Sequence, residues 1–247
     1  MRIKFLGSGD AFGSGGRFNT CFLVDRGTSR FLIDCGASSM IAMRAFDVDP
    51  NGIGAIVISH LHGDHFGGLP FFILDAQHVS RRREPLIIAG PQGLEKRLEA
   101  LMEAMFPGSW STERKFAIEF IELAPLAATR VGAQGPRVTG YPVSHPSGAT
   151  SLALRIECGD QIIAYTGDTE WVEALEPACR GADLLIAECY QYDRPVRYHM
   201  SLTTLREQLP PLGARRVILT HMSAEMLAHV AEAGGFMVAS DGLELTV

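Results

Sequence analysis

The sequence predicts an α/β fold in which helices cover mixed β-sheets. Short β-rich runs bounded by Gly or Asp open the chain, such runs alternate with helix-like apolar spacing in both halves, and a β-rich stretch fills the middle. Helices and strands that alternate along a chain usually pack in layers. The 247 residues, 47% of them hydrophobic, suffice for a sizeable core. Because we find no low-complexity linker and no fixed-period repeat, we expect one domain over residues 1-247.

The first half of the chain begins with strands and then alternates. Short runs rich in β-branched and aromatic residues predict strands at residues 3–6, 20–24, 30–33, 55–59 and 85–89. Apolar residues at helical spacing predict helices at residues 38–46, 67–79 and 94–106.

The middle of the chain is expected to be all β, and the last third to alternate again. Strands are predicted at residues 117–123, 129–131, 137–143, 151–157 and 161–165, with Gly159-Asp160 forming a tight turn. Helices follow at residues 171–179, 203–209 and 224–233, with strands at 183–187 and 217–219 and two short strands at the end. Pro210 and Gly234 mark the ends of two of these helices.

Composition and charge narrow the class of protein. The five cysteines are scattered, odd in number and never in a C-x-x-C pair, which argues against a disulfide framework and for a reducing, cytoplasmic location. No apolar run is long enough for a membrane span, and the N-terminal run stops too early for a signal peptide. The net charge of −6 argues weakly against a large nucleic-acid footprint. We interpret the basic run at residues 81–83 as a solvated helix end, with contact to a substrate phosphate as the alternative.

A dense cluster of potential metal ligands follows the apolar strand at residues 55–59. His60, His62, Asp64 and His65 lie within six residues, at the C-terminal end of a strand, where α/β folds usually place their sites. Imidazole and carboxylate ligands together suit zinc, iron or manganese. One ion needs about four ligands, and this loop cannot supply all of them to a single ion without strain. Two metal ions that share the loop are therefore the simpler interpretation.

Further ligands would have to come from other strand ends, and three candidates occupy such positions. His145 follows the strand at 137–143, Asp168 the strand at 161–165, and His221 the strand at 217–219. Alone, either histidine would be an ordinary hydrogen-bonding residue, and Asp168 would be the N-cap of the helix expected after it. Together with the cluster at 60–65, they are predicted to complete the metal site.

This pattern resembles the metallo-β-lactamase-fold hydrolases. The H-x-H-x-D-H run, the later single His, the Gly-Asp pair and the final Thr-His occur in the family's order along the whole chain. The resemblance implies a four-layer αββα sandwich of two mixed sheets with a dinuclear metal site at one edge. It also implies that His60, His62 and His145 bind one metal, that Asp64, His65 and His221 bind the other, and that Asp168 bridges the two.

Several residues point to the phosphodiesterase branch of this superfamily. Antibiotic-hydrolysing members have Cys in place of the bridging Asp168, and flavodiiron-type members have Glu in place of His62. The branch typified by the tRNA 3′-processing endonucleases adds an acid on the next strand and a His-Ser-Thr-like segment. Glu188 and the Tyr198-His199-Met200-Ser201 segment are similar, so the resemblance implies a catalytic pair of Glu188 and His199 that protonates the leaving oxygen.

The substrate is expected to be a small molecule rather than tRNA. The tRNA-processing members insert a long arm between the third His and the bridging Asp, whereas only a hairpin fits between His145 and Asp168. The size and the C-terminal stretch at 217–247 look more like the small PhnP-like phosphodiesterases, although the loop at 7–19 lacks their cysteine cluster. The resemblance also suggests a homodimer. The glycine-rich turn at residues 7–16 would line the pocket by close backbone approach, or else be a plain connection.

The predicted activity is the hydrolysis of a small phosphodiester or cyclic phosphate. Two divalent ions, Zn²⁺ first and Mn²⁺ or Fe as alternatives, held roughly 3.5–4 Å apart would generate a bridging hydroxide that attacks phosphorus. Asp64 would orient that hydroxide as well as bind metal.

Two alternatives to this activity remain open. One is a carboxylic ester, lactone or thioester hydrolase in which Tyr190, Tyr192 or Tyr198 stabilises the oxyanion. The other is a non-catalytic binding module of the same fold. The presence of all seven ligand positions argues against this second alternative.

Overall fold

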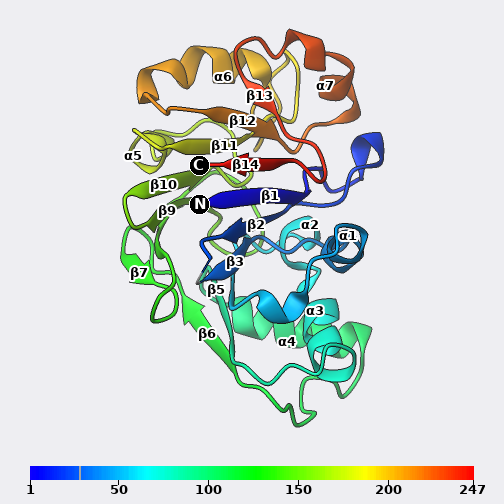
Figure 1. The fold of residues 1–247 in the computed structure, drawn as a ribbon. Coiled ribbons are helices and arrows are strands. Elements are labelled where there is room, and N and C mark those ends of the chain that lie inside the picture. Colours follow the sequence, from blue (N-terminus) through cyan, green and yellow to red (C-terminus); the bar gives the residue numbers. More distant parts are fainter. Residues whose placement is uncertain (28) are drawn as a thin grey trace.

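The computed structural model describes residues 1–27 and 29–247, which form two β-sheets packed face to face between layers of helices (Figure 1). The first sheet has seven strands in the order β14-β1-β2-β3-β4-β5-β6. Its strands are β1 (Arg2–Gly7), β2 (Cys21–Asp25), β3 (Arg30–Ile33), β4 (Ala55–Val57), β5 (Leu86–Gly90), β6 (Ile118–Glu122) and β14 (Glu244–Thr246). The second sheet has seven strands in the order β13-β12-β11-β10-β9-β8-β7. Its strands are β7 (Ala128–Arg130), β8 (Arg137–Pro142), β9 (Leu152–Cys158), β10 (Gln161–Tyr165), β11 (Leu184–Glu188), β12 (Val217–Thr220) and β13 (Met237–Val238).

Both sheets change from antiparallel to parallel pairing along the chain. In the first sheet, β1, β2 and β3 pair antiparallel, and β3 to β6 pair parallel. In the second, β7 to β10 pair antiparallel, and β10 to β13 pair parallel. Parallel strands need crossover connections, and these carry the helices of each outer layer. The parallel parts therefore place several strand ends, each followed by a loop, at one end of the sandwich.

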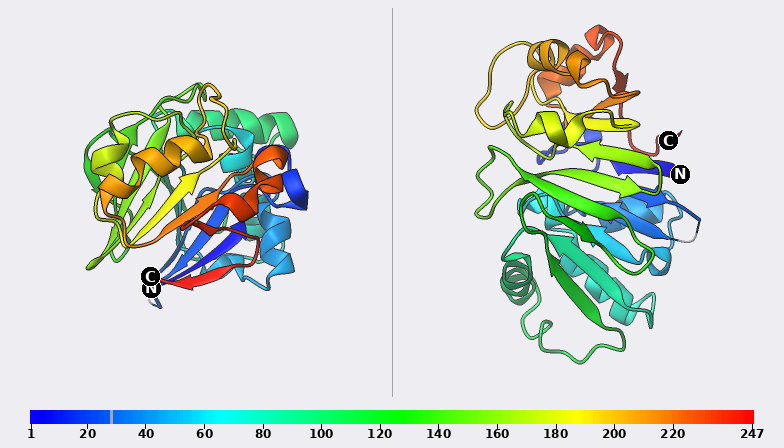
Figure 2. Two further views of the ribbon diagram at one scale, coloured as in Figure 1. Left: turned by 90° about the horizontal axis from the view of Figure 1, so that it is seen from above. Right: turned by 90° about the vertical axis from the view of Figure 1, so that its left-hand side faces the viewer.

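The helices cover the outer faces of the two sheets (Figures 1 and 2). On the first sheet lie α1 (Ser39–Ala45), α2 (Gly63–Phe66), α3 (Leu69–His78) and α4 (Leu94–Met105). On the second lie α5 (Leu175–Cys179), α6 (Leu202–Gln208) and α7 (Ala224–Ala228). Short 3-10 turns add Ser14–Gly16, Pro50–Gly52, Pro210–Leu212 and Val230–Glu232. The predicted αββα arrangement with two mixed sheets is confirmed.

The space between the sheets is filled by inward-facing apolar side chains from both. Leu154 and Ile186 of the second sheet are fully buried in this layer. The rings of Phe22 and Tyr165 meet across it edge to face, with their centroids 5.4 Å apart. Such aromatic pairs add to the free energy gained by burying apolar area, so the two sheets form one continuous core.

Most predicted elements are found within a few residues of their expected bounds, but three helices differ. The loop after β4 contains the four-residue helix α2, where the sequence predicted only a turn toward a helix at Gly67. Helix α5 begins at Leu175 rather than at Trp171. Asp168 does not cap this helix, because its carboxylate faces the histidines, as predicted for a metal ligand. The last predicted helix, at 224–233, ends at Ala228 and continues as a 3-10 turn.

The sequence analysis interpreted the basic run at residues 81–83 as a solvated helix end, and this is wrong for one of its three residues. Arg82 is only 3% exposed and donates hydrogen bonds to the carbonyls of Glu84, Pro50 and Pro85. A buried guanidinium with several carbonyl partners stabilises the chain that surrounds it. Arg82 therefore ties the turn after α3 to the start of β5, and only its two neighbours face solvent.

The structure also bears on the expectations that the chain lacks a disulfide framework and a membrane span. All five cysteines lie in the described part of the chain and are buried free thiols. None of the helices in residues 1–27 and 29–247 combines the length and apolarity that a membrane crossing requires.

We expect Leu154→Ala to lower the free energy of unfolding by about 2–5 kcal/mol, because it opens a cavity between the sheets. Val79→Ala, at a side chain that is 66% exposed, is the control and should change stability by less than about 0.5 kcal/mol. Guanidinium unfolding followed by circular dichroism measures both. A loss below about 1 kcal/mol for Leu154→Ala would contradict the continuous core.

Candidate metal centre

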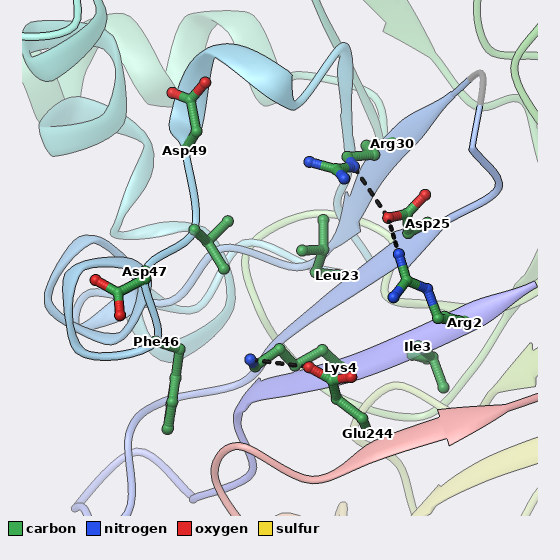
Figure 3. Close-up of a pocket in the computed structure, with 11 residues that line it drawn as sticks. Arg2, Ile3, Lys4, Leu23, Asp25, Arg30, Phe46, Asp47, Asp49 and Glu244 are labelled. Carbon is green, nitrogen blue, oxygen red and sulfur yellow. Dashed lines mark hydrogen bonds and ion pairs between the residues drawn. The ribbon is translucent and has the colours of Figure 1, made fainter.

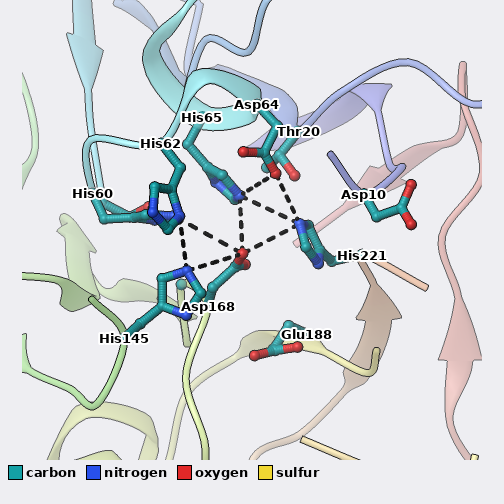
Figure 4. Close-up of polar contacts among 12 residues, drawn as sticks. Asp10, Thr20, His60, His62, Asp64, His65, His145, Asp168, Glu188 and His221 are labelled. Atoms are coloured by element: carbon teal, nitrogen blue, oxygen red, sulfur yellow. Dashed lines mark hydrogen bonds and ion pairs between the residues drawn. The ribbon is translucent and has the colours of Figure 1, made fainter. Parts of the chain in front are cut away.

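Seven side chains from four segments meet at one end of the sandwich (Figure 4). The loop after β4 and helix α2 contribute four of them, and the loops after β8, β10 and β12 contribute one each. These seven side chains, which we call the cluster, are His60, His62, Asp64, His65, His145, Asp168 and His221. They are the same seven residues that the sequence analysis predicted as ligands, and the structure brings all of them together.

The cluster divides into two groups of ligand atoms joined by one carboxylate. His60, His62 and His145 form the first group, and Asp64, His65, Asp168 and His221 form the second, with the atoms of each group within 4.8 Å of one another. Oδ2 of Asp168 lies 3.3 Å from Nε2 of both His65 and His221. The same oxygen lies 3.9 Å from Nε2 of both His60 and His145. Asp168 is thus placed between the groups, where it could bind a metal ion on either side.

Three of the five histidines are held by one ring nitrogen, so that the other faces the centre. Nδ1 of His65 donates to Asp34 at 2.7 Å, Nδ1 of His145 donates to the carbonyl of Tyr198 at 3.0 Å, and Nε2 of His62 donates to the carbonyl of Pro146 at 3.1 Å. Such outer hydrogen bonds fix the tautomer and the orientation of metal-binding histidines. The imidazoles are therefore oriented before any ion binds.

Two buried polar atoms test whether the donor set fits a metal. Within the described residues, Nε2 of His60 and Oδ1 of Asp168 are buried without a hydrogen-bond partner. A buried polar atom without a partner is costly, and a metal ion is one way to satisfy it. The imidazole and carboxylate donors suit Zn²⁺, Mn²⁺ or Fe. The residues present fit a dinuclear metal site.

The charges of the cluster also favour cations. Burial acts to lower the pKa of both His65 and His221, but the carboxylates of Asp168 and Asp64 and the hydrogen bonds to carboxylates together outweigh it. The pKa of His221 rises to about 9, and that of His65 rises well above its usual range. Metal ligands must be deprotonated, so an ion that binds here displaces these protons. Metal affinity should accordingly increase with pH.

Asp34, which the sequence analysis did not select, supports the cluster through its hydrogen bond to His65. It follows β3 with a φ of 56° and is fully buried. Besides His65, its carboxylate accepts hydrogen bonds from the backbone N–H and the hydroxyl of Ser59, each at 2.7 Å. Asp34 thereby joins the end of β3 to the loop after β4. The strand-then-polar-residue pattern that selected Asp168 also applies to Asp34 and would have found it.

Glu188 and His199 lie beside the cluster, as the resemblance implied. Oε1 of Glu188 accepts the backbone N–H of Thr169 at 2.7 Å, and Oε2 accepts Nδ1 of His199 at 3.2 Å. Burial raises the pKa of Glu188. Burial acts to lower the pKa of His199, but the hydrogen bond and charge of Glu188 raise it. His199 thus tends to keep a proton, and its ring centroid is 5.0 Å from that of His145.

The glycine-rich turn begins beside the cluster, and its first glycine is packed tightly against the backbone of Asn19. The carbonyl of Ser8 accepts the backbone N–H of His221 at 3.1 Å. A Cβ at Gly7 would lie 1.9 Å from the carbonyl oxygen of Asn19, so only glycine fits there. Asp241 accepts hydrogen bonds from the N–H and the hydroxyl of Ser8. Ser8, at the start of the turn, therefore supports the backbone of His221.

The three tyrosines named for the ester-hydrolase alternative lie in different places. The ring of Tyr190 stacks on His199, and Tyr198 lies next to His145 with a φ of 67°. The ring of Tyr192 instead stacks on His229, at 4.1 Å between centroids. Tyr190 and Tyr198 therefore border the cluster, and Tyr192 packs on a histidine outside it.

A separate surface pocket of about 260 Å³ lies over β1, β2 and β14 (Figure 3). Arg2 and Arg30 both pair with Asp25, and Lys4 pairs with Glu244 at 2.9 Å. Because these cations are already matched by carboxylates, the pocket presents little net charge to a ligand. The cluster is the better candidate for the functional site.

Solved structures that cover essentially the whole chain have the metallo-β-lactamase fold, and the cluster together with the curated ribonuclease relatives indicates a metal-dependent hydrolase. More particularly, the chain belongs to the family described as Anti-Pycsar protein Apyc1, whose model matches residues 1–242.

Individual relatives agree with the phosphodiesterase branch predicted from the sequence. A curated Ribonuclease Z of Methanothermobacter thermautotrophicus is 28% identical over 274 aligned positions, covering 90% of this chain and 87% of that protein. The short form of human tRNase Z matches with a TM-score of 0.82 and 24% identity, over 100% of this chain and 99% of the other. A diphosphatase of the PhnP family matches with a TM-score of 0.77 and 19% identity, over 100% and 97%. The predicted resemblance is confirmed.

We expect Asp34→Asn to weaken zinc binding by about 10- to 100-fold, because the acceptor that orients His65 loses its charge. Titration against a chromogenic chelator measures the affinity. Asp25→Asn is the matched control. Asp25 is a carboxylate of the same sheet, but it pairs with Arg2 and Arg30, and Arg30 begins β3 whereas Asp34 follows its end. Equal zinc affinity in Asp34→Asn and wild type would exclude this supporting role.

Proposed function

We propose that this protein hydrolyses a small phosphodiester or cyclic phosphate at the cluster. The observation that supports this most strongly is the placement of Asp168 between two groups of ligand atoms, with the Glu188–His199 pair beside them. Two metal ions bound there would activate water and neutralise charge on the phosphoryl oxygens. The name Ribonuclease Z and the description of a PhnP-family diphosphatase are in line with chemistry at phosphorus.

The assignment of ligands follows the two groups. His60, His62 and His145 would hold one ion, Asp64, His65 and His221 the other, and Asp168 would contact both. Zn²⁺ is the metal we propose, because five imidazoles and two carboxylates are ligands that zinc commonly takes. Mn²⁺ and Fe accept the same donors and are the alternatives.

Three residues of the chain would act on the substrate and the attacking water. Asp64, a member of the second group, would accept a hydrogen bond from that water and orient it toward phosphorus. Nδ1 of His199 is bound to Glu188, so the proton available to the leaving oxygen is at Nε2. Glu188 is fully buried, and it stabilises the protonated imidazole until that proton is transferred.

The short stretch between His145 and Asp168 favours a small substrate over tRNA, because it has no room for a tRNA-binding arm. A short loop, β9 and β10 occupy this stretch, with no further element. The alignment with Ribonuclease Z runs over 274 positions, more than the 247 residues of this chain, so that relative contains segments without a counterpart here. We therefore propose a small-molecule substrate. We also propose a cytoplasmic location, which the buried free cysteines support, and a homodimer.

Metal-reconstituted protein is expected to hydrolyse bis(p-nitrophenyl) phosphate, and EDTA treatment should abolish this turnover. His62→Ala and Asp168→Ala should each lose metal together with at least about 100-fold of kcat/KM, because metal ions supply several kcal/mol of transition-state stabilisation. His78→Ala, at an exposed histidine of α3, is the control. Steady-state absorbance assays and metal analysis measure both effects.

If protein with both sites filled fails to cleave this diester, the phosphodiesterase proposal is wrong. Carboxylic esters, lactones and thioesters would then be tested in the same way. If His62→Ala and Asp168→Ala keep full activity, the metal assignment is wrong as well.

His199→Ala should lower turnover far more for a substrate with a basic leaving group than for one with a stable leaving anion. Positioned acids contribute about 100- to 10,000-fold when the leaving group needs a proton. We therefore expect a large loss of kcat on diphenyl phosphate and a small one on bis(p-nitrophenyl) phosphate. Equal losses on the two diesters would disprove the role of His199 as proton donor.

A further inference from the structure

The imidazole of His199 is packed against an aromatic ring to which the proposed phosphodiesterase mechanism gives no role. Tyr190 comes two residues after Glu188, just beyond the end of β11. Its ring lies 4.6 Å from the ring of His199, centroid to centroid, with an angle of 28° between the planes. This is the nearest of the rings that surround His199, since those of His145 and His221 are 5.0 and 5.8 Å away.

We propose that Tyr190 is a positioning residue that holds His199 in the orientation needed for proton transfer to the leaving oxygen. The proposal rests on the role given to His199 above. Tyr190 acts through this imidazole and touches neither the reacting atoms nor the metals.

His199 needs such a support because, within the described residues, its side chain makes a single hydrogen bond and the other rings lie farther away. The contact from Nδ1 to Glu188 is 3.2 Å long, and the side chain of His199 is 19% exposed. One hydrogen bond leaves a ring free to swing about the bond axis, which would move Nε2 away from the substrate. A flat ring against its face removes that freedom, and stacked pairs of this kind are favourable beyond the area they bury.

The backbone of Tyr190 is fixed independently of its side chain. Its N–H donates to the carbonyl of Met200 at 3.0 Å, and its carbonyl accepts the N–H of Ser223 at 3.1 Å. Ser223 caps α7, which follows His221 closely. Tyr190 therefore lies on a rigid junction of three segments that carry Glu188, His199 and His221, and truncation of its ring leaves the junction in place.

The ring and not the hydroxyl is responsible for the contact. Across the part of the chain that the structure describes, no hydrogen bond of the Tyr190 phenol is found, whereas the phenol of Tyr192 bonds to Glu232. A phenylalanine offers the same flat surface, and a leucine does not. Comparing the phenylalanine and leucine variants therefore distinguishes the effect of the stacked ring from that of the hydroxyl.

The chain contains a matched control for the loss of a tyrosine–histidine stack. Tyr192 stacks on His229 with 4.1 Å between centroids and 12° between planes. It lies two residues from Tyr190 in the sequence, but its partner is no member of the cluster. Tyr192→Leu therefore removes a similar contact without touching His199.

The test compares Tyr190→Leu, Tyr190→Phe and Tyr192→Leu in the metal-loaded full chain on two diesters. Phenolate is a more basic leaving group than p-nitrophenolate, so only diphenyl phosphate depends strongly on a well-placed proton. We expect Tyr190→Leu to lower kcat on diphenyl phosphate by about two- to tenfold, from the strength of one aromatic pair. Its kcat on bis(p-nitrophenyl) phosphate, its KM values and its metal content should stay near wild type. Tyr190→Phe and Tyr192→Leu should match wild type on both diesters.

Other results would overturn the proposal in distinguishable ways. Equal losses on the two diesters would mean that the ring supports the fold or the metal ligands. A loss in Tyr190→Phe would assign the effect to the hydroxyl. If His199→Ala discriminates between the diesters and Tyr190→Leu does not, Tyr190 has no positioning role although the proposed function stands. If His199→Ala itself does not discriminate, the proton-donor role fails and the proposal for Tyr190 fails with it.

Discussion

The crowding of imidazoles and carboxylates in a buried space is the constraint on which the rest of this structure depends. Buried carboxylates such as Asp168 and Asp64 are costly unless cations compensate them, and the neighbouring histidines do so only when protonated. The surrounding backbone keeps these groups together. Asp34, Tyr198 and His221 all adopt positive φ, a strained conformation that persists only when the neighbouring structure enforces it.

Both sheets contribute the loops that hold the cluster. The N–H of Leu152 on β9 donates to the carbonyl of Ser59 after β4, a backbone bond of 3.0 Å that crosses from one sheet to the other. Ser59 precedes His60 and also binds Asp34, so a single residue connects both sheets to the first ligand loop. The centre is thus part of the seam of the sandwich, and packing between the sheets and the geometry of the cluster depend on each other.

The parts of this architecture that were predictable from the sequence are those with a local signal. Alternating runs marked nearly every strand, and the spacing of His60, His62 and His65 marked the ligand loop. Helix α2 was missed because it has only four residues and begins at a glycine. The late start of α5 was missed because no side-chain cap marks it: the N-cap residue is Ala174, and no side chain there accepts a hydrogen bond from the first turn. The stack of Tyr190 on His199 depends on where a loop returns, which residue spacing does not encode.

The strand β14 and Asp241 have a consequence for the order in which the protein matures. Asp241 fixes the glycine-rich turn, and β14 pairs with β1, yet both follow His221 in the chain. A ribosome adding about 5–20 residues per second needs on the order of seconds to extend from His221 to β14. During that interval all the ligands exist, but the support of His221 does not. The loop at His60 is thus made long before the contacts that support His221, and the cluster reaches its final geometry only once the last strand is in place.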